Sequence, residues 1–375
     1  WYGTPNTGYV ALNTANFPTP AITDGSAYFQ TTTYTGAGYP TEVNQSDNST
    51  FQPDFVWVKR RNGATTHNLF DAVRGVSSQL YSNLTNAEGT VSNAISFDAD
   101  GFTAAADPIT GDTGSSSNTF VGWQWLAGNG TASNGNGSIA STVSANTTAG
   151  FSIVSYTGNA TGGATIGHGL SQAPEMVITK SRDNGTGRNW AVYHVVPGPT
   201  KYGELDNTNT FNTGSTRWND TAPSSTVVTL GSQQTTNDSG AAMIAYCWYG
   251  VEGFSKFGSF KGNNSLDGPF IYTGFKPAFV MAKRSDSTSD WFILDAQRPA
   301  YNVIGGGGVG QLPANLTYAE SSLSTYAIAD FLSNGFKVRH NMTYGYWNVS
   351  GGTYIYMAFA ENPFGGEDVA PATAR

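Results

Sequence analysis

Histidine is the side chain best suited to metal binding or proton transfer near neutral pH, and this chain contains few of them. The four are His67, His168, His194 and His340. No two show a metal-binding spacing such as HxxxH, and none accompanies a cluster of cysteines or carboxylates. The single cysteine, Cys247, lies inside an apolar stretch that is typical of a buried thiol. These side chains therefore predict no metal, no cofactor and no catalytic residue.

Two pairs of acidic residues are the next candidates for chemistry, because a glycosidase needs two carboxyl groups about 5–9.5 Å apart in a cleft. Asp71 and Asp295 occupy matching places in two similar stretches of the chain, and so do Glu88 and Glu320. A repeat copies its framework, whereas an active site needs to occur only once. We therefore expect these matched carboxylates to be structural.

A basic group recurs three times, each time after an apolar run. Its members are Lys59, Arg60 and Arg61, then Lys180 and Arg182, then Lys283 and Arg284. Such a group could contact an anion or a glycan. Alternatively, it lies at a strand end and pairs with Asp71 or Asp295, and its recurrence in every copy favours this structural role. Pairs of this kind contribute only ~0–1 kcal/mol when exposed.

An aromatic cluster near the C-terminus departs from the repeated pattern. Tyr344, Tyr346 and Trp347 stand in a polar stretch, where the matching stretches at 108–112 and 232–235 are polar or small. Aromatic rings in a loop can stack on sugar rings or anchor a partner chain. Packing against a neighbouring domain or subunit would explain them equally well. These three residues are the candidate glycan- or partner-binding site.

Three similar stretches organise the chain and position the residues above. They begin at Pro53, Pro174 and Pro277. Fourteen to sixteen residues later, and again four residues beyond, they place His67 and Asp71, Trp190 and His194, and Trp291 and Asp295. The prolines are 121 and 103 residues apart, so each unit is long enough to close its own core. This spacing predicts three tandem domains rather than the shorter units of a propeller or solenoid.

The composition narrows the functional classes. Charged residues are 12% of the chain, about half of the ~25% usual in soluble domains, and the net charge is -8. Nucleic-acid binding needs clustered lysine and arginine, so we expect no nucleic-acid partner. No stretch reaches the ~20 apolar residues of a membrane span, so we expect no membrane partner. A surface made soluble by uncharged polar groups suits a virion, cell-surface or secreted protein.

The apolar pattern predicts an all-β protein. Its segments are short, rich in β-branched and aromatic residues, and bounded by Gly, Asn, Asp and Pro, as in a β-sandwich or barrel. Asp100-Gly101 and Asn334-Gly335 predict tight hairpins, and the Gly-, Asn- and Ser-rich stretch 128–149 predicts a linker. The expected segments are an N-terminal segment at 1–24, β-sandwich repeats at 25–127, 150–250 and 251–365, and a C-terminal tail at 366–375.

Taken together, these stretches resemble the repeat-bearing structural proteins of tailed, mainly marine, bacteriophages, which are tail-fibre-like or virion proteins. The resemblance runs from about Tyr28 to Arg375 and includes Val121-Gly122-Trp123-Gln124-Trp125, Ala245-Tyr246-Cys247-Trp248 and Gly253-Phe254-Ser255-Lys256-Phe257-Gly258. The segment from Gly8 to Asn16 looks like the closing strand of a SPRY-type sandwich, which favours a fragment or processed product. The resemblance implies three tandem jelly-roll, concanavalin-A-like β-sandwich repeats after a short N-terminal strand segment, and it transfers no catalytic residue.

The leading functional expectation is a non-enzymatic virion structural protein of a fibre, a tail appendage or a capsid decoration, with the capability of an adhesin. The resemblance implies a location on the virion, other virion proteins and host-surface glycans as partners, and self-association as a homo-oligomer, with a trimer favoured. The alternatives are a secreted or surface lectin, a polysaccharide depolymerase, and a cellular filament subunit of phage ancestry.

Overall fold

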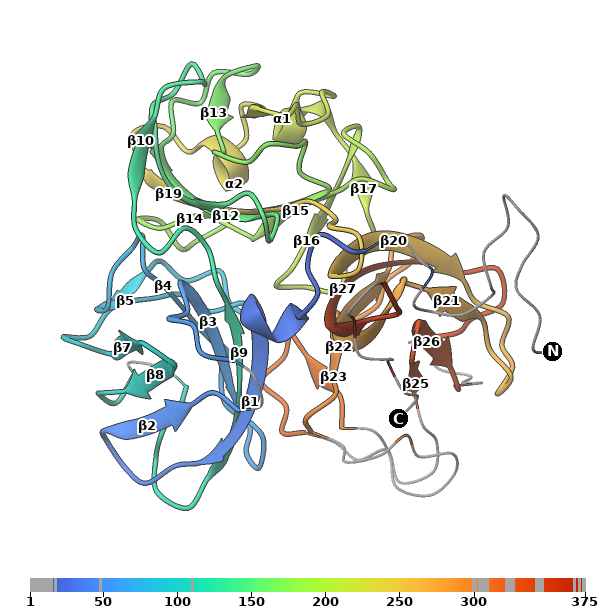
Figure 1. Ribbon diagram of the computed structural model, residues 1–375. Helices are drawn as coiled ribbons and strands as arrows, with labels where there is room; N and C mark the ends of the chain where they lie inside the picture. Colours follow the sequence, from blue (N-terminus) through green and yellow to red (C-terminus); the bar gives the residue numbers. More distant parts are fainter. Residues whose placement is uncertain are drawn as a thin grey trace.

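The computed structural model shows an all-β protein whose strands form several antiparallel sheets (Figure 1). It describes residues 16, 19–46, 49–108, 111–298, 302, 310–320, 328–340, 347–366, 369 and 372. The predicted all-β class is therefore confirmed. The named helices in this part of the chain are single turns, η2 (Gly25–Ala27), α1 (Ser215–Trp218) and α2 (Gln234–Asn237).

Three central sheets repeat one strand order, in which an opening strand, a closing strand, the strand at the repeated proline and a short fourth strand lie side by side. In module 1 (residues 24–127) these are β1 (Phe29–Thr35), β9 (Thr119–Trp125), β3 (Phe55–Arg60) and β4 (Asn68–Asp71). In module 2 (residues 128–250) they are β12 (Phe151–Thr157), β19 (Ala242–Trp248), β14 (Met176–Ser181) and β15 (Ala191–His194). In module 3 (residues 251–363) they are β20 (Ser255–Lys261), β27 (Thr353–Pro363), β22 (Phe275–Arg284) and β23 (Phe292–Asp295). The sequence repeat is thus a repeat of sheet topology.

Each module adds a smaller second sheet. Its strands are β2 (Thr41–Asn44), β8 (Gly101–Ala104) and β7 (Ile95–Asp98) in module 1, β13 (Thr165–Gly167) and β18 (Val227–Thr229) in module 2, and β21 (Phe270–Tyr272), β26 (Gly335–Val338) and β25 (Ala329–Leu332) in module 3. In module 1, Val56 and Val58 of β3 face this sheet, while Phe55 and Trp57 join a larger core on the opposite side. The alternation follows from the two-residue period of a strand.

The predicted hairpins are present as β7–β8 and β25–β26. Gly101 has a φ of +150°, which favours glycine. At Gly335 the reason is a close approach, because a Cβ there would lie 2.0 Å from the carbonyl oxygen of Ile271 on the neighbouring strand. Both glycines therefore let a hairpin pair with a third strand.

The stretch 128–149, for which the composition predicts a linker, differs from that expectation. It contains β10 (Ala132–Asn134) and β11 (Ser141–Asn146). β11 pairs with β12, and β10 pairs with β11 as the edge strand of the central sheet. Backbone pairing satisfies the amide groups of an edge strand even where its side chains are small and polar, and Val143 adds one buried apolar contact. At the other edges stand β16 (Lys201–Glu204), β17 (Asn212–Thr213) and β24 (Leu312–Pro313), with β5 (Ser78–Gln79) and β6 (Gly89–Thr90) forming a separate pair.

The three modules lie around a common centre and share one core (Figure 1). Rings meet across each boundary: Phe55 and Tyr246 at 4.5 Å between centroids, Trp125 and Phe279 at 5.7 Å, and Phe211 and Trp291 at 6.2 Å. The expectation that each unit closes its own core is therefore wrong for these aromatic faces. In modules 1 and 3 the aromatic side of the proline strand faces a neighbouring module, through Phe55 and Phe279.

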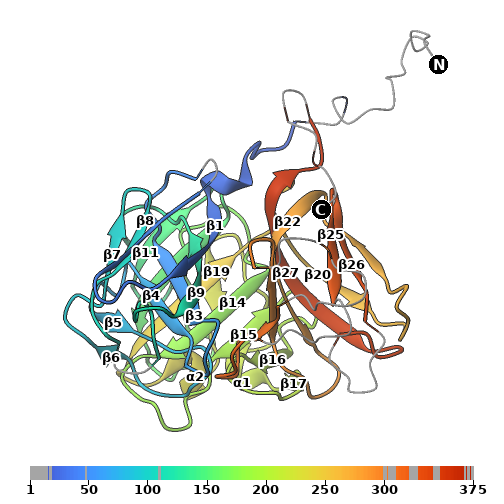
Figure 2. The ribbon, with the colours of Figure 1, turned by 90° about the horizontal axis from the view of Figure 1, so that it is seen from below.

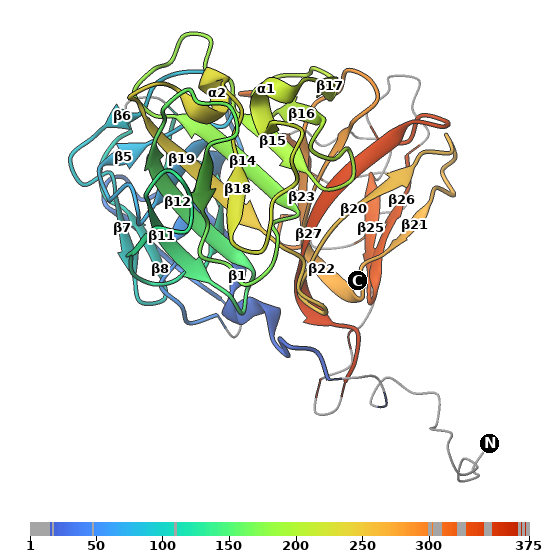
Figure 3. The same ribbon diagram turned by 90° about the horizontal axis from the view of Figure 1, so that it is seen from above.

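The two ends of this arrangement are distinct. Figure 2 shows η2 beside the end of β27 at one end of the molecule, and α1 and α2 at the opposite end. Figure 3 gives the same order from the other side. The segments that follow β4, β15 and β23 supply the carbonyl acceptors Tyr81, Glu204 and Pro313 of contacts between modules. The pocket described below lies at the η2 end, where it is lined by Pro20 and Pro363.

Candidate functional site

The residues that recur after each proline lie where the modules meet. Trp190 Nε1 donates to Tyr81 O at 2.8 Å, Trp291 Nε1 donates to Glu204 O at 2.8 Å, and His67 Nε2 donates to Pro313 O at 3.0 Å. His67 Nδ1 accepts from Trp57 Nε1 at 2.9 Å, which leaves the ring proton on Nε2. The three contacts run from module 2 to 1, from 3 to 2 and from 1 to 3. Head-to-tail contacts that close in this way form a ring.

One polar side chain in each module fixes the loop that offers the accepting carbonyl. Asn83 Oδ1, Asp206 Oδ1 and Asn315 Oδ1 accept from the backbone N–H groups of His67, Trp190 and Trp291, at 2.9, 3.1 and 2.9 Å. The donor and the accepting loop of one module are thus tied together. Each module therefore presents both halves of the contact in a fixed relation.

The residue four positions further on makes a second contact across each boundary. Tyr246 O–H donates to Asp71 Oδ2 at 2.7 Å, Trp123 Nε1 donates to Asp295 Oδ2 at 2.9 Å, and His194 Nε2 donates to Tyr356 O at 3.1 Å. We name the boundaries junction 1–2, junction 3–1 and junction 2–3 in that order. Buried arginines three residues on, Arg74 and Arg298, neutralise the two aspartates.

Junction 2–3 carries histidine because its partner strand offers no side-chain donor. Met357 has the register position of Trp123 and Tyr246, and a thioether has no N–H or O–H to give. A carboxylate would meet no donor there, whereas His194 supplies its own proton while its Nδ1 accepts from Val196 N at 3.2 Å. Burial lowers the pKa of His194 to about 4, so the ring is neutral and needs no arginine.

A third set of contacts follows the same ring. The backbone N–H of Glu88 donates to Arg182 O at 2.7 Å, that of Glu320 to Arg61 O at 2.7 Å, and that of Phe211 to Ser285 O at 3.1 Å. Ion pairs reinforce the first two, Glu88 with Arg182 and Glu320 with Arg61. At junction 2–3 the reinforcement is a hydroxyl, since Thr210 Oγ1 donates to Ser285 O at 2.8 Å. The matched acids are therefore engaged in the framework, as expected.

The recurring lysines have a structural role, but their predicted partners are wrong. Lys59, Lys180 and Lys283 are buried, and burial lowers the pKa of each to about 8. Their ammonium groups donate to backbone carbonyls, Lys59 to Arg60 O and Lys180 to Thr85 O across junction 1–2. Arginine takes the aspartates instead, because Arg74 and Arg298 lie within the same loop as Asp71 and Asp295.

The predicted aromatic site is not supported at Trp347. Its side chain is 1% exposed and packs on Phe292, with 5.9 Å between ring centroids, so the ring fills the interior of module 3 and offers no face to a sugar. Tyr344 and Tyr346 lie outside the described residues. The two remaining histidines, His168 and His340, are also buried with lowered pKa values, and burial raises the pKa of Cys247 to about 12.

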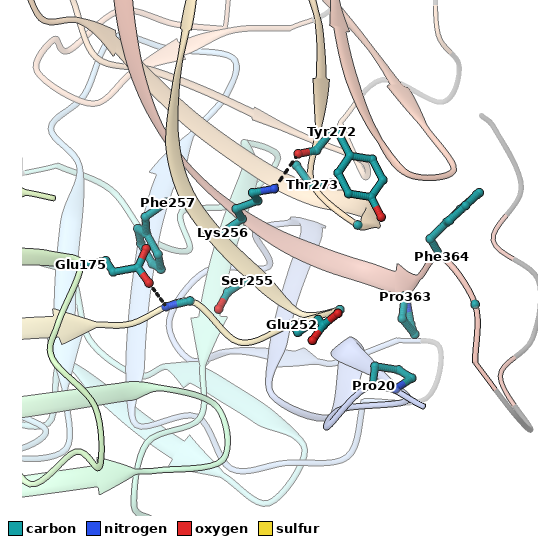
Figure 4. A pocket seen from close by; sticks show the side chains of 14 residues that line it. Pro20, Glu175, Glu252, Ser255, Lys256, Phe257, Tyr272, Thr273, Pro363 and Phe364 are labelled. Carbon is teal, nitrogen blue, oxygen red and sulfur yellow. Dashed lines mark hydrogen bonds between the residues drawn. The ribbon is translucent and has the colours of Figure 1, made fainter. Parts of the chain in front are cut away.

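A pocket of about 480 Å³ opens where modules 2 and 3 join at the η2 end (Figure 4). Side chains of opposite charge and an aromatic ring line it, among them Glu175, Glu252, Lys256 and Tyr272. Lys256 Nζ donates to Tyr272 O at 2.9 Å and lies 5.2 Å from the centre of the tyrosine ring. Glu175 Oε1 accepts from Gly250 N at 3.2 Å, and burial raises the pKa of Glu175. Sequence reasoning missed this site, because its residues come from separate segments.

Within the described part of the chain, no three His, Cys, Asp or Glu side chains gather closely enough to hold a metal ion. No helix found there is long and apolar enough to cross a membrane. The fold and its contacts define an all-β protein of three topologically matched modules closed into a ring. A family described as a domain of unknown function (DUF7483) matches residues 24–363, and the chain belongs to this family. No curated protein and no solved structure matches the chain.

Proposed function

We propose that the chain is a non-enzymatic structural protein of a tailed-bacteriophage virion, in a fibre, a tail appendage or a capsid decoration. The observation that carries this proposal is the closed ring of junction contacts. His67, His194 and the matched carboxylates, which could otherwise do chemistry, hold modules together, as a framework protein requires. Low charge and the resemblance to phage structural proteins support the same proposal.

We also infer that each module is a β-sandwich of the jelly-roll, concanavalin-A-like kind. The pairing of a central antiparallel sheet with a smaller second sheet in each module supports this inference. The predicted self-association as a trimer would have to use outer surfaces, since the lateral contacts of all three modules are satisfied inside one chain. Other virion proteins are the expected partners.

Quantitative mass spectrometry of purified phage particles tests the location. The chain should copurify with particles in a fixed number of copies per genome, and antibody labelling should place it at one position on the particle surface. Its presence in infected-cell lysate but absence from particles after density-gradient purification would contradict the proposal. Light scattering on the purified chain would give the oligomeric state separately.

A second candidate function is glycan binding, as in a lectin or an adhesin. One observation favours it, the pocket that combines an exposed tyrosine with carboxylate and ammonium groups. The polysaccharide depolymerase is not proposed, because Glu88, Glu320, Asp71 and Asp295 are engaged in ion pairs with arginine.

A further inference from the structure

We propose that the pocket between modules 2 and 3 binds the ring of an uncharged hexopyranoside, with Tyr272 as the stacking surface and Glu175 and Lys256 as the groups that hold its hydroxyls. This proposal names the site and ligand class of the glycan-binding candidate. It does not depend on where the protein is located, so its failure and that of the virion proposal are separate results.

Tyr272 is placed for contact with a ligand rather than for packing. It is 54% exposed on β21, and Phe270 two residues before it is 45% exposed on the same face of that strand. Asn44 holds the matching place in module 1, since Asn44 pairs with Gly101 as Tyr272 pairs with Gly335. An aromatic side chain on the solvent side of a strand lacks a core to fill. Module 3 thus places a tyrosine at the pocket where module 1 has a polar asparagine at the matching place.

Glu175 also differs from the residue at the matching place in module 1, and like Tyr272 it lines the pocket. Asp54 holds its place in module 1, where one carboxylate oxygen accepts from the backbone N–H groups of Ala127 and Asn129, at 2.8 and 2.9 Å, and the residue is fully buried. Glu175 keeps one longer bond of this kind, to Gly250 at 3.2 Å, and is partly exposed in the pocket. The extra methylene carries its carboxylate out to the cavity. An acid that ties down the backbone in module 1 thus faces a ligand site in module 2.

The chemistry of the lining favours a sugar over other small ligands. A pyranose offers an apolar ring face to an aromatic side chain and hydroxyls that both donate and accept hydrogen bonds. Carboxylates accept from hydroxyls and ammonium groups donate to them, and such charge-assisted bonds are short and strong. Phosphate groups would meet two carboxylates, Glu175 and Glu252, against one ammonium. The volume of about 480 Å³ lies within the ~300–1,000 Å³ usual for small-ligand sites.

The floor of the pocket is fixed by the chain path. Gly253 has a φ of +79°, and a Cβ there would lie 2.7 Å from Pro20 Cβ, so the turn between modules 2 and 3 packs directly on the segment before η2. The ammonium group of Lys256 is held in place by its hydrogen bond to Tyr272 O. The polar groups are therefore oriented before a ligand arrives, which reduces the entropy lost on binding.

Saturation-transfer NMR on the full chain tests the proposal. The probes are methyl α-D-glucopyranoside, methyl α-D-mannopyranoside, methyl β-D-galactopyranoside and N-acetyl-D-glucosamine at about 10 mM, so that binding with a Kd of about 1 mM is detected. At least one probe should receive saturation through its ring protons. Tyr272→Ala should weaken that binding about ten-fold, Tyr272→Phe should keep it within about two-fold, and Glu175→Gln should weaken it several-fold.

The matched control is Tyr318→Ala, which removes an exposed tyrosine of module 3 that does not line the pocket and is 61% exposed. It should leave binding unchanged, and circular dichroism and thermal unfolding should show that every variant folds. Absence of saturation transfer to all four probes would overturn the proposal. So would a signal that Tyr272→Ala leaves intact.

Discussion

Junctions 1–2 and 3–1 differ from junction 2–3 in the groups that cross them. The first two use a buried aspartate–arginine pair that accepts from Tyr246 or Trp123, and an outer glutamate–arginine pair. Junction 2–3 keeps the same geometry with neutral groups, His194 inside and Thr210 outside. The backbone contacts are common to all three, so they define the ring. The side chains around them are exchangeable as long as each donor meets an acceptor.

The comparison separates framework from function. Trp190 and Trp291, which recur at matching places, make the same contact in both copies. Tyr272, which is exposed, and Glu175, which is partly exposed, differ from the residues at the matching places in module 1, and both line a pocket. Both divergent residues line the pocket at junction 2–3, where His194 and Thr210 take the places of the ion pairs. Departure from the repeat marks the proposed site only where the divergent residue also lines the pocket, because Trp347 departs from the repeat as well and is buried.

The strongest test of the comparison is Asp71→Ala. It leaves Arg74 buried without its main partner and Tyr246 O–H without an acceptor, so we expect a loss of about 3–5 kcal/mol in the free energy of unfolding. His194→Ala at the matching place removes a neutral group and should cost about 1–3 kcal/mol. Urea unfolding at pH 7 measures both. Equal losses would show that the charged and neutral junctions do not differ as described.

The second test uses pH. The pKa of His194 is about 4 in the folded protein and near 6.5 when unfolded, so between these values the unfolded state binds more protons. Stability is therefore fully present above about pH 6.5 and falls toward pH 4, by up to about 1.4 kcal/mol per unit for this residue. His194→Gln should reduce the slope by that amount. An unchanged slope in unfolding experiments from pH 7 to 4 would contradict the assignment.

A smaller effect is expected at the outer pairs. Glu88 accepts from both Arg74 and Arg182, and the side chain of Arg74 is fully buried, so Glu88→Gln should cost about 1.5–3 kcal/mol. Glu320 pairs with Arg61 alone, and both are partly exposed, so Glu320→Gln should cost about 0–1 kcal/mol. Thermal unfolding at low and high salt would rank them. A greater loss at Glu320 would reverse the proposed order.

A comparably small change is expected at junction 2–3. Thr210→Val removes one hydroxyl donor while Ser285 O keeps its bond from Phe211 N, so the cost should be about 0.5–1 kcal/mol and independent of salt. Urea unfolding in 0.05 and 0.5 M salt provides the measurement. Salt dependence as large as that of Glu88→Gln would mean that charge contributes to this boundary as well.

Much of the fold followed from residue patterns. The apolar runs after Pro53, Pro174 and Pro277 predict β3, β14 and β22. The common spacing from these prolines indicates that His67, Trp190 and Trp291 occupy matching places. A strand period shows that two faces exist, but it does not show which module covers each face. The ring could therefore not be predicted, because contacts such as Trp190 to Tyr81 join residues that are distant in sequence.

The site escaped prediction for a related reason. Phe270-Ile271-Tyr272 reads as a strand with apolar residues throughout, and nothing in the sequence reveals that Ile271 is the buried member. Trp347 is the reverse case, because its polar neighbours predict an exposed loop whereas its ring packs on Phe292. The side of a strand that faces solvent depends on the partner sheet, which is a tertiary property.

Closing the ring within one polypeptide has a consequence for stoichiometry. In a homotrimer, every substitution appears three times around the symmetry axis. A substitution that creates a pocket at one boundary therefore creates it at all three. Here each boundary is encoded separately, and the one next to Gly250 and Lys256 can change while the other two keep the assembly intact. A ring of three matched modules can therefore present one binding site that is not repeated at the other boundaries, at one copy per chain.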